Sequence, residues 1–204
     1  MKTPEAHTPV SFTRFPVISL SAEYLVMGHL MRRNILAYKA PPNNEGYDLI
    51  CIHPDPRSVT RQIRVQVKSR LASDHGGGFP VKKRTIDAFD YLVVAFLNVG
   101  YVFHRARCSE SIEGRKAPDF YTFPASFIRE HHDARSSWEK VMIRGLDLSA
   151  YHNERGFELI AAALDVEYPS KKKKEPNKAP EPTPTAGTSA AEQPLVPAAG
   201  VAHL

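Results

Sequence analysis

Two short segments joined by a proline-rich turn constrain the fold of this chain most. Residues 47–53 form a branched apolar run, and residues 63–69 alternate between apolar and polar side chains. A His-Pro-Asp-Pro-Arg-Ser segment follows the first run, and prolines with an Asp are typical of a turn. The sequence therefore predicts a β-hairpin. Because strand side chains alternate, its second strand should have one apolar and one polar face.

The remaining periodic segments indicate further helices and strands. Ser21 is a plausible N-cap, because its hydroxyl can accept a hydrogen bond from an amide of the first helical turn. The helix that it would begin extends to about residue 36, and short strands are expected at 35–38, 91–97 and 101–104, the last two as a pair. Later helices are expected near 124–131 and 154–164. This order of elements predicts a mixed α/β or α+β layer fold.

The C-terminal segment differs in composition from the rest. Residues 169–204 begin with a lysine run and continue in Pro, Ala, Thr and Gly without an aromatic residue. Such a segment cannot bury enough apolar surface to offset its chain entropy, so we expect a disordered tail at 169–204 and a folded domain at 1–168. Five lysines and three glutamates give this tail +2 of the chain's net charge of +5, which leaves +3 for the folded domain.

Composition excludes some classes of protein. No run approaches the roughly 18 apolar residues of a membrane span, and the N-terminal residues lack the apolar stretch of a signal peptide. Two cysteines, Cys51 and Cys108, are too few for a disulfide scaffold. We therefore expect a cytoplasmic protein without a membrane partner. The net positive charge permits an anionic partner.

Asp48 is the first candidate functional residue. It begins an otherwise apolar run, where a carboxylate is costly unless it is paired or bound to a cation. The alternative is that Asp48 only caps the start of the strand, next to a turn. Gln66 and Lys68 lie on the polar face of the following strand, which on its own is equally typical of a strand half exposed to water.

Glu23 is the third candidate position. Helical spacing places it on one face with Val26, Met27 and Leu30, so its carboxylate should lie on the inward side of the helix. A plainer role is that of an acid in the first turn, near the positive end of the helix dipole. An inward carboxylate would still need a partner, and a metal site beneath the helix would supply one.

Together these residues resemble the PD-(D/E)xK nuclease superfamily. The resemblance rests on Glu23, on Gly-Tyr-Asp-Leu-Ile at 46–50 and on Val-Gln-Val-Lys-Ser-Arg at 65–70, and it covers about residues 18–105. It is nearest to the branch of Holliday-junction-resolvase-like and intron-endonuclease-like enzymes. It implies a restriction-endonuclease-like α/β fold, with a mixed central sheet flanked by helices. It also implies Mg²⁺-dependent hydrolysis of DNA phosphodiester bonds.

The resemblance also implies roles for individual residues. The Asp48 carboxylate and the Gln66 side-chain oxygen would bind Mg²⁺, or Mn²⁺ in its place, and the Val67 backbone carbonyl would add a ligand. Lys68 would assist the attacking water and steady the phosphate charge, and Glu23 would support the metal shell. The pattern departs from the family in two places. Tyr47 replaces the proline, and the neutral Gln66 replaces an acid, which should lower metal affinity.

Basic residues around the hairpin fit a phosphate partner. We expect nucleic-acid contacts, without sequence readout, from Arg61, Arg64, Arg70, Lys82, Lys83 and Arg84. The alternative is a solvated basic surface.

A non-catalytic nucleic-acid-binding or assembly protein that retains the nuclease fold is the competing functional class, and an unrelated α/β domain is a third. Resolvase-like enzymes tend to dimerise in order to cut two strands, so a homodimer is an open alternative to a monomer. His131 and His132 are expected at a surface helix end.

Overall fold

The computed structural model describes residues 17–42, 44–72, 78–104, 107–135 and 137–167, and the predicted tail lies outside them. The chain divides into two units, Met1–Ser170 and Lys171–Leu204, and every described residue belongs to the first. In chain order, the elements are α1 (Val17–Met31), β1 (Leu36–Lys39), β2 (Leu49–Ile52), η1 (Pro56–Ser58), β3 (Gln62–Arg70), β4 (Phe79–Pro80), η2 (Lys83–Ala88), β5 (Tyr91–Phe96), β6 (Val99–His104), β7 (Arg107–Arg115), β8 (Asp119–Pro124), α2 (Ala125–Glu130), β9 (His132–Asp133), β10 (Lys140–Val141), η3 (Ser149–Tyr151) and α3 (Asn153–Ala163).

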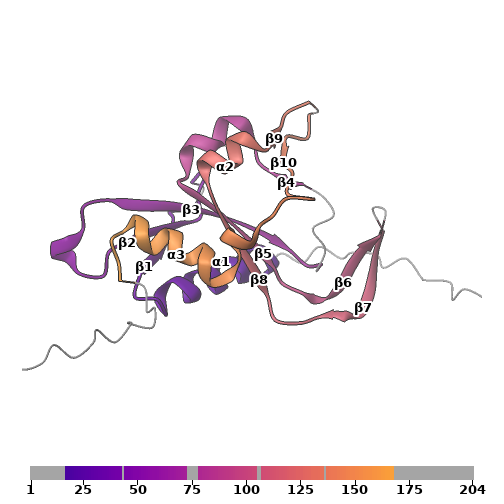
Figure 1. Ribbon diagram of the computed structural model, residues 1–204, viewed down its shortest axis with the longest axis horizontal. Coiled ribbons are helices and arrows are strands. Elements are labelled where there is room, and N and C mark those ends of the chain that lie inside the picture. Colours follow the sequence, from indigo (N-terminus) through magenta and orange to yellow (C-terminus); the bar gives the residue numbers. More distant parts are fainter. Residues whose placement is uncertain (1–16, 43, 73–77, 105–106, 136, 168–204) are drawn as a thin grey trace, which may run out of the picture. The chain divides into compact units, whose positions relative to one another are not determined.

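A mixed five-stranded sheet forms the centre of this unit (Figure 1). Its strands follow the order β1-β2-β3-β5-β8, and only the β3–β5 pair is parallel. The predicted hairpin is confirmed as β2 and β3, in which Leu49 lies opposite Val65. The expectation of an α/β fold with a mixed central sheet flanked by helices is therefore confirmed.

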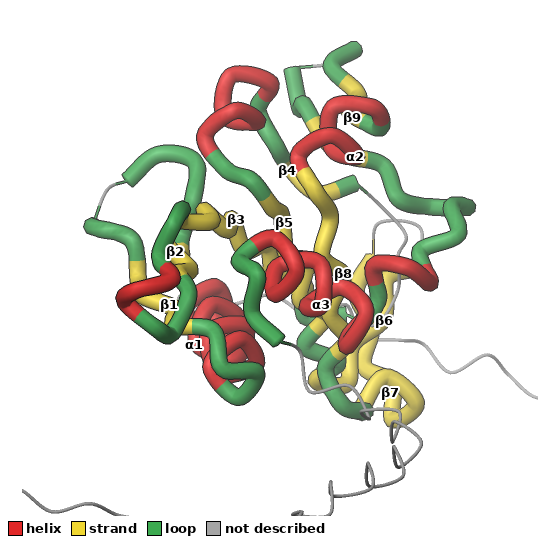
Figure 2. The backbone as a smooth tube through the Cα atoms, turned by 60° about the vertical axis from the view of Figure 1, so that its left-hand side comes forward, coloured by secondary structure: helices red, strands yellow, loops and turns green. Residues whose placement is uncertain are grey.

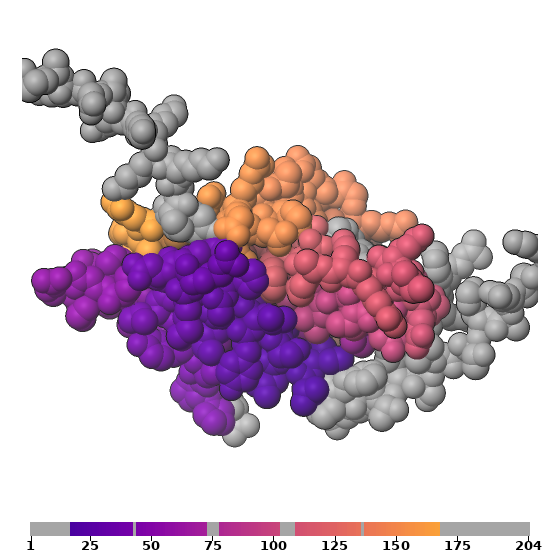
Figure 3. All heavy atoms as spheres, turned by 90° about the horizontal axis from the view of Figure 1, so that it is seen from below, coloured from indigo at the N-terminus to yellow at the C-terminus, as the bar shows by residue number. Residues whose placement is uncertain are grey.

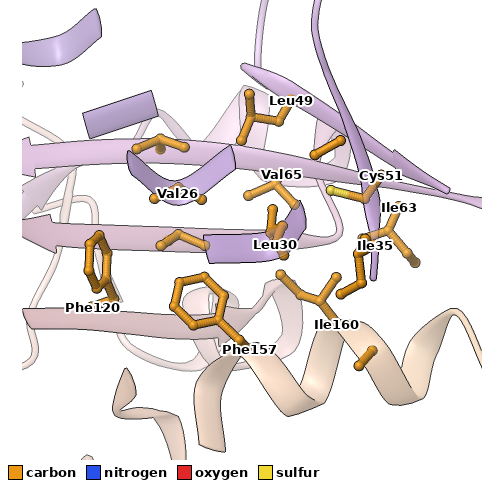
Figure 4. Packing of buried hydrophobic residues seen from close by; sticks show 14 of the residues in the cluster. Val26, Leu30, Ile35, Leu49, Cys51, Ile63, Val65, Phe120, Phe157 and Ile160 are labelled. Atoms are coloured by element: carbon orange, nitrogen blue, oxygen red, sulfur yellow. The ribbon is translucent and has the colours of Figure 1, made fainter. Parts of the chain in front are cut away.

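Helices α1 and α3 pack against one face of the sheet. Ala22, Val26 and Leu30 recur every four residues along α1 and are fully buried. They meet the apolar residues of β2 and β3 and, from α3, the side chains of Phe157 and Ile160 (Figure 4). This face is closed by apolar packing, which supplies most of the driving force for folding.

The other face carries a second apolar cluster under shorter elements. η2 and α2 lie side by side over it, together with the small sheet of β4, β10 and β9 (Figures 1 and 2). Its centre is formed by Leu92, Val94 and Phe96 of β5 and by Phe123 of β8. Because β5 is buried on both faces, it is a central strand of the sheet.

Two local expectations were wrong. Ser21 lies inside α1 rather than at its N-cap, and its hydroxyl donates a hydrogen bond to the Ile18 carbonyl at 2.8 Å. β5 and β6 do not pair with each other, because β5 pairs with β3 and β8 while β6 pairs with β7 in a separate two-stranded ribbon. The chain turns between them at Asn98, whose φ of 52° is in the left-handed region that Asn tolerates.

Helix α1 is apolar on its outer side as well. Val17, Leu20, Tyr24 and Met31 are exposed there, and the segment forms a broad part of the surface in Figure 3, where it is coloured indigo. With apolar residues on both sides, the helix has little amphipathic contrast, so spacing alone indicates its buried face only weakly. Within the described ranges, no helix has both the length and the hydropathy to cross a bilayer.

Candidate active site

Asp48 is held at the point where β2 begins. Its backbone N–H donates to the Val65 carbonyl at 2.9 Å, and its own carbonyl accepts from the Ala40 N–H at 2.8 Å. The side chain is used as well, because Oδ2 accepts a hydrogen bond from the Val67 backbone N–H at 2.7 Å. The carboxylate is therefore fastened to β3, next to Gln66 and Lys68.

Gln66 is a polar residue in a buried position. Its side chain extends from the β3 face opposite Val65 and Val67, and the residue is only 9% exposed. The side-chain oxygen Oε1 is buried, and no donor contacts it among the residues that the structure describes. An unpaired buried acceptor costs about 1–3 kcal/mol. Such an atom therefore calls for a missing partner, such as water or a cation.

Lys68 follows Gln66 on the same face of β3, because alternate strand residues point to the same side. Burial lowers the pKa of its ammonium group below the usual range, and the Asp48 carboxylate acts in the opposite direction. The Lys68 ammonium group and the Asp48 carboxylate are therefore close enough to interact electrostatically. The structure brings Asp48, Gln66 and Lys68 together around the first residues of the hairpin.

These residues match the ligand preference of a small, hard cation. Mg²⁺ prefers oxygen ligands and retains several waters, so one carboxylate and one amide oxygen can suffice on the protein side. Across the described ranges, no three His, Cys, Asp or Glu side chains gather in a way that could hold a metal ion. A metal here would therefore rely on Asp48, on the orphaned Gln66 Oε1 and on backbone oxygen.

Glu23 has a different partner. Its carboxylate forms an ion pair with Lys39 of β1, and only 16% of the Glu23 side chain is exposed. The expectation that this acid lies inward is confirmed by its burial and by the buried Val26 and Leu30 beside it. Within the described residues it has no hydrogen bond or ion pair with Asp48, Gln66 or Lys68. The helix that carries it packs against the opposite face of the sheet.

The six predicted nucleic-acid-binding residues fall into two groups. The Arg64 guanidinium is held in place by the Asp90 carboxylate, with N–O distances of 3.1 and 3.2 Å. Arg70 donates to the Gly78 carbonyl at 3.2 Å and lies over the Phe79 ring. Both arginines therefore anchor β3 to neighbouring segments. The other four are exposed, namely Arg61, Lys82, Lys83 and Arg84.

Segment η2, which carries Arg84, contacts the loop that leads into Asp48. Gly46 of this loop has a φ of 107°, and a Cβ built there would lie 2.4 Å from the Cβ of Ala88 in η2. The loop and η2 are thus in close contact, and Arg84 pairs across them with Glu45 at 2.7 Å. This contact places the basic start of η2 beside the candidate site.

Sequence reasoning missed two features of this region. Asp90 precedes an apolar strand just as Asp48 does, but its carboxylate also accepts from the Arg64 backbone N–H at 2.7 Å and is fully used. The position of Asp90 directly before an apolar strand, like that of Asp48, is the sequence feature that could have identified it. His132 is not at a surface helix end, because α2 ends at Glu130 and the His132 side chain is only 6% exposed. No local pattern indicated that burial.

Comparisons with known proteins yield similarity to solved structures. No protein-family model matches this chain, and no curated protein matches it either. Among solved structures, the chain is similar to a bacterial homing endonuclease, I-Ssp6803I. The two share 14% sequence identity and a TM-score of 0.44, over 75% of this chain and 95% of the endonuclease.

Proposed function

We propose that this protein is a Mg²⁺-dependent endonuclease that hydrolyses DNA phosphodiester bonds, with a restriction-endonuclease-like fold and a PD-(D/E)xK-type site. One observation carries the proposal: the buried Gln66 Oε1 has no donor in the part of the chain that the structure describes, and it lies beside an anchored Asp48 carboxylate. A purely structural strand would gain stability from an apolar residue at this position, because an unsatisfied buried acceptor is costly. A cation ligand accounts for its presence.

The residues of the site would divide the chemistry between them. Asp48, Gln66 and the Val67 carbonyl would hold Mg²⁺, which supplies Lewis-acid polarisation of the scissile phosphate and of the attacking water. The Val67 N–H orients the Asp48 carboxylate by its hydrogen bond. Glu23 is already paired with Lys39, so the proposal rests on the other residues.

Lys68 would act on the proton and the phosphate. Because burial lowers its pKa, a larger fraction of Lys68 is neutral near neutral pH than for an exposed lysine. The neutral amine can accept a proton from the attacking water, and the protonated form offsets negative charge on the phosphate. General acid–base assistance of this kind contributes roughly 10²–10⁴-fold to rate.

The test is cleavage of linear duplex, branched and single-stranded DNA with Mg²⁺, Mn²⁺ or EDTA. We expect wild-type protein to cut in Mg²⁺ and not in EDTA. Asp48→Asn and Lys68→Met should each reduce the rate by about 10²-fold or more. Asp90→Asn is the matched control, because Asp90 also begins an apolar strand but is paired with Arg64. Equal rates in Asp48→Asn and wild type, or no cleavage of any substrate, would refute the catalytic proposal.

A non-catalytic nucleic-acid-binding protein is the second candidate. The exposed basic side chains just before β3 and at the start of η2 favour it, because phosphate contacts need no metal. It predicts salt-sensitive DNA binding that EDTA leaves unchanged and that Gln66→Ala does not weaken. Measuring binding and cleavage on the same DNA separates the two candidates.

A further inference from the structure

A pocket of about 210 Å³ lies apart from the candidate active site, between η2, α2 and β9. Its lining residues are Lys83, Ile86, Asp87, Arg129 and His132. One water occupies about 30 Å³ of liquid, so the pocket can hold a group several times larger. Ile86 is buried and supplies the apolar part of the wall, and the other four residues are ionisable.

Two cations and one acid line the pocket, and a second acid lies beside it. Arg129 donates to the Asp87 carboxylate at 2.7 Å, and the Glu139 carboxylate accepts a hydrogen bond from the Lys83 backbone N–H. Lys83 has no acid within ion-pair distance among the described residues. Its contact with Glu139 is made by the backbone N–H, so the ammonium group remains available. The Lys83 ammonium group, beside the Arg129 guanidinium, is therefore the group of this pocket that can attract an anion.

His132 adds a buried hydrogen-bonding group. A carbonyl can only accept, so His132 Nε2 donates its hydrogen to the Val81 oxygen at 2.8 Å. No described residue hydrogen-bonds to the other ring nitrogen, Nδ1. The Glu139 carboxylate lies 3.6 Å from Nε2, so this acid stands beside the ring as well.

The position of η2 links this pocket to the candidate active site. One side of η2 contacts the loop before Asp48, through Gly46 and Ala88, and another side lines the pocket through Lys83 and Ile86. A 3₁₀ segment of six residues is about 12 Å long. That length corresponds to three or four phosphates of one DNA strand at about 3.4 Å of axial rise.

We infer that the pocket of Lys83, Arg129 and His132 binds a backbone phosphate of the DNA substrate, a few nucleotides from the phosphate that is cut. This inference rests on the proposed function for the identity of its ligand. The contact positions the duplex along η2 and carries no sequence information. The groups that set its charge are Lys83 and Asp87 of η2, Arg129 of α2, and Glu139 beside His132.

The test measures binding of a fluorescent duplex by full-length protein in EDTA, so cleavage plays no part. Lys83→Ala and Arg129→Ala should each weaken binding about tenfold and reduce the salt slope by about one. Arg135→Ala is the matched control, because Arg135 is an exposed arginine paired with Asp133 outside the pocket. It should change affinity less than twofold.

One further measurement locates the contact. Single methylphosphonate substitutions, which remove one phosphate charge at a time, should weaken wild-type binding at one position where Lys83→Ala shows no further loss. Wild-type affinity in the pocket variants, or no such coupled position, would overturn the inference even if the protein cuts DNA. Loss of cleavage with intact pocket coupling would instead refute only the catalytic proposal.

Discussion

The two faces of β3 show how one strand can serve both packing and chemistry. Ile63, Val65 and Val67 enter the cluster beneath α1 and α3, where the described side chains are apolar and closely packed. Gln66 and Lys68 extend to the other side. There the buried Gln66 Oε1 has no donor among the described residues, and Lys68 is partly desolvated. Departures from well-satisfied packing are expected at functional sites, so the second face is where chemistry should be sought.

Asp48 and Asp90 occupy similar positions beside β3 but have different partners. Asp48 and Asp90 both precede apolar strands next to β3. Asp90 holds the Arg64 guanidinium and backbone N–H, so its charge is balanced. The Asp48 carboxylate has only the Val67 N–H as a hydrogen-bond donor among the described residues. Position on the strand is thus a weaker indicator of function than the set of partners.

The largest effect is expected on the apolar face. Phe157 is fully buried in α3, with its ring 5.7 Å from Phe120 and the Arg33 guanidinium 4.8 Å away. Phe157→Ala should lower the free energy of unfolding by about 3–5 kcal/mol, because it leaves a cavity in close packing. Urea denaturation followed by circular dichroism measures the change. A loss below about 1 kcal/mol would mean that this face is not the main core.

A change of opposite sign is expected at Gln66. Gln66→Leu removes a buried acceptor that lacks a donor among the residues described. The free energy of unfolding should therefore rise by about 1–3 kcal/mol while metal-dependent cleavage is lost. Val65→Ala, one residue earlier on the apolar face, is the control and should destabilise. A large destabilisation by Gln66→Leu would show that Oε1 has a partner in the folded protein.

Lys68 should make stability depend on alkaline pH. Its pKa is lowered in the folded state, so between that value and the ordinary 10.5 the unfolded chain binds more protons than the folded one. The free energy of unfolding therefore rises with pH in this window, and the burial penalty is fully present below it. Comparing wild type with Lys68→Met by urea denaturation between about pH 7 and pH 10 isolates this residue. The free energy of unfolding of wild type minus that of Lys68→Met should rise over this range. If this difference stays constant or falls as pH rises, the assignment is contradicted.

The smallest effect is expected at the surface. Arg84 and Glu45 form an ion pair with side chains 68% and 66% exposed. Exposed pairs contribute about 0–1 kcal/mol, so Arg84→Ala should change stability by about 0.5 kcal/mol or less. A double-mutant cycle with Glu45→Ala measures the coupling between them. A coupling well above about 1 kcal/mol would show that the pair fastens the Asp48 loop to η2.

Local pattern determined much of this protein. Alternation over residues 63–69 and the preceding turn predicted β2 and β3, and the same alternation placed Gln66 and Lys68 on one face. Helical spacing identified Val26 and Leu30 as buried, with Glu23 beside them. These features depend on neighbours within a few residues, which periodicity and turn chemistry record directly.

Tertiary structure alone decided the partners of these residues. β5 lies between β3 and β8 instead of pairing with β6, and Asp48 is tied to the Val67 N–H while Glu23 is paired with Lys39. His132 becomes buried because η2, α2 and β9 meet around it. Such contacts join segments far apart in the chain, and their choice depends on burial and loop closure across the whole domain. Residue type and spacing therefore indicated which side chains can do chemistry, and only the assembled sheet decided which partner each of them has within the described ranges.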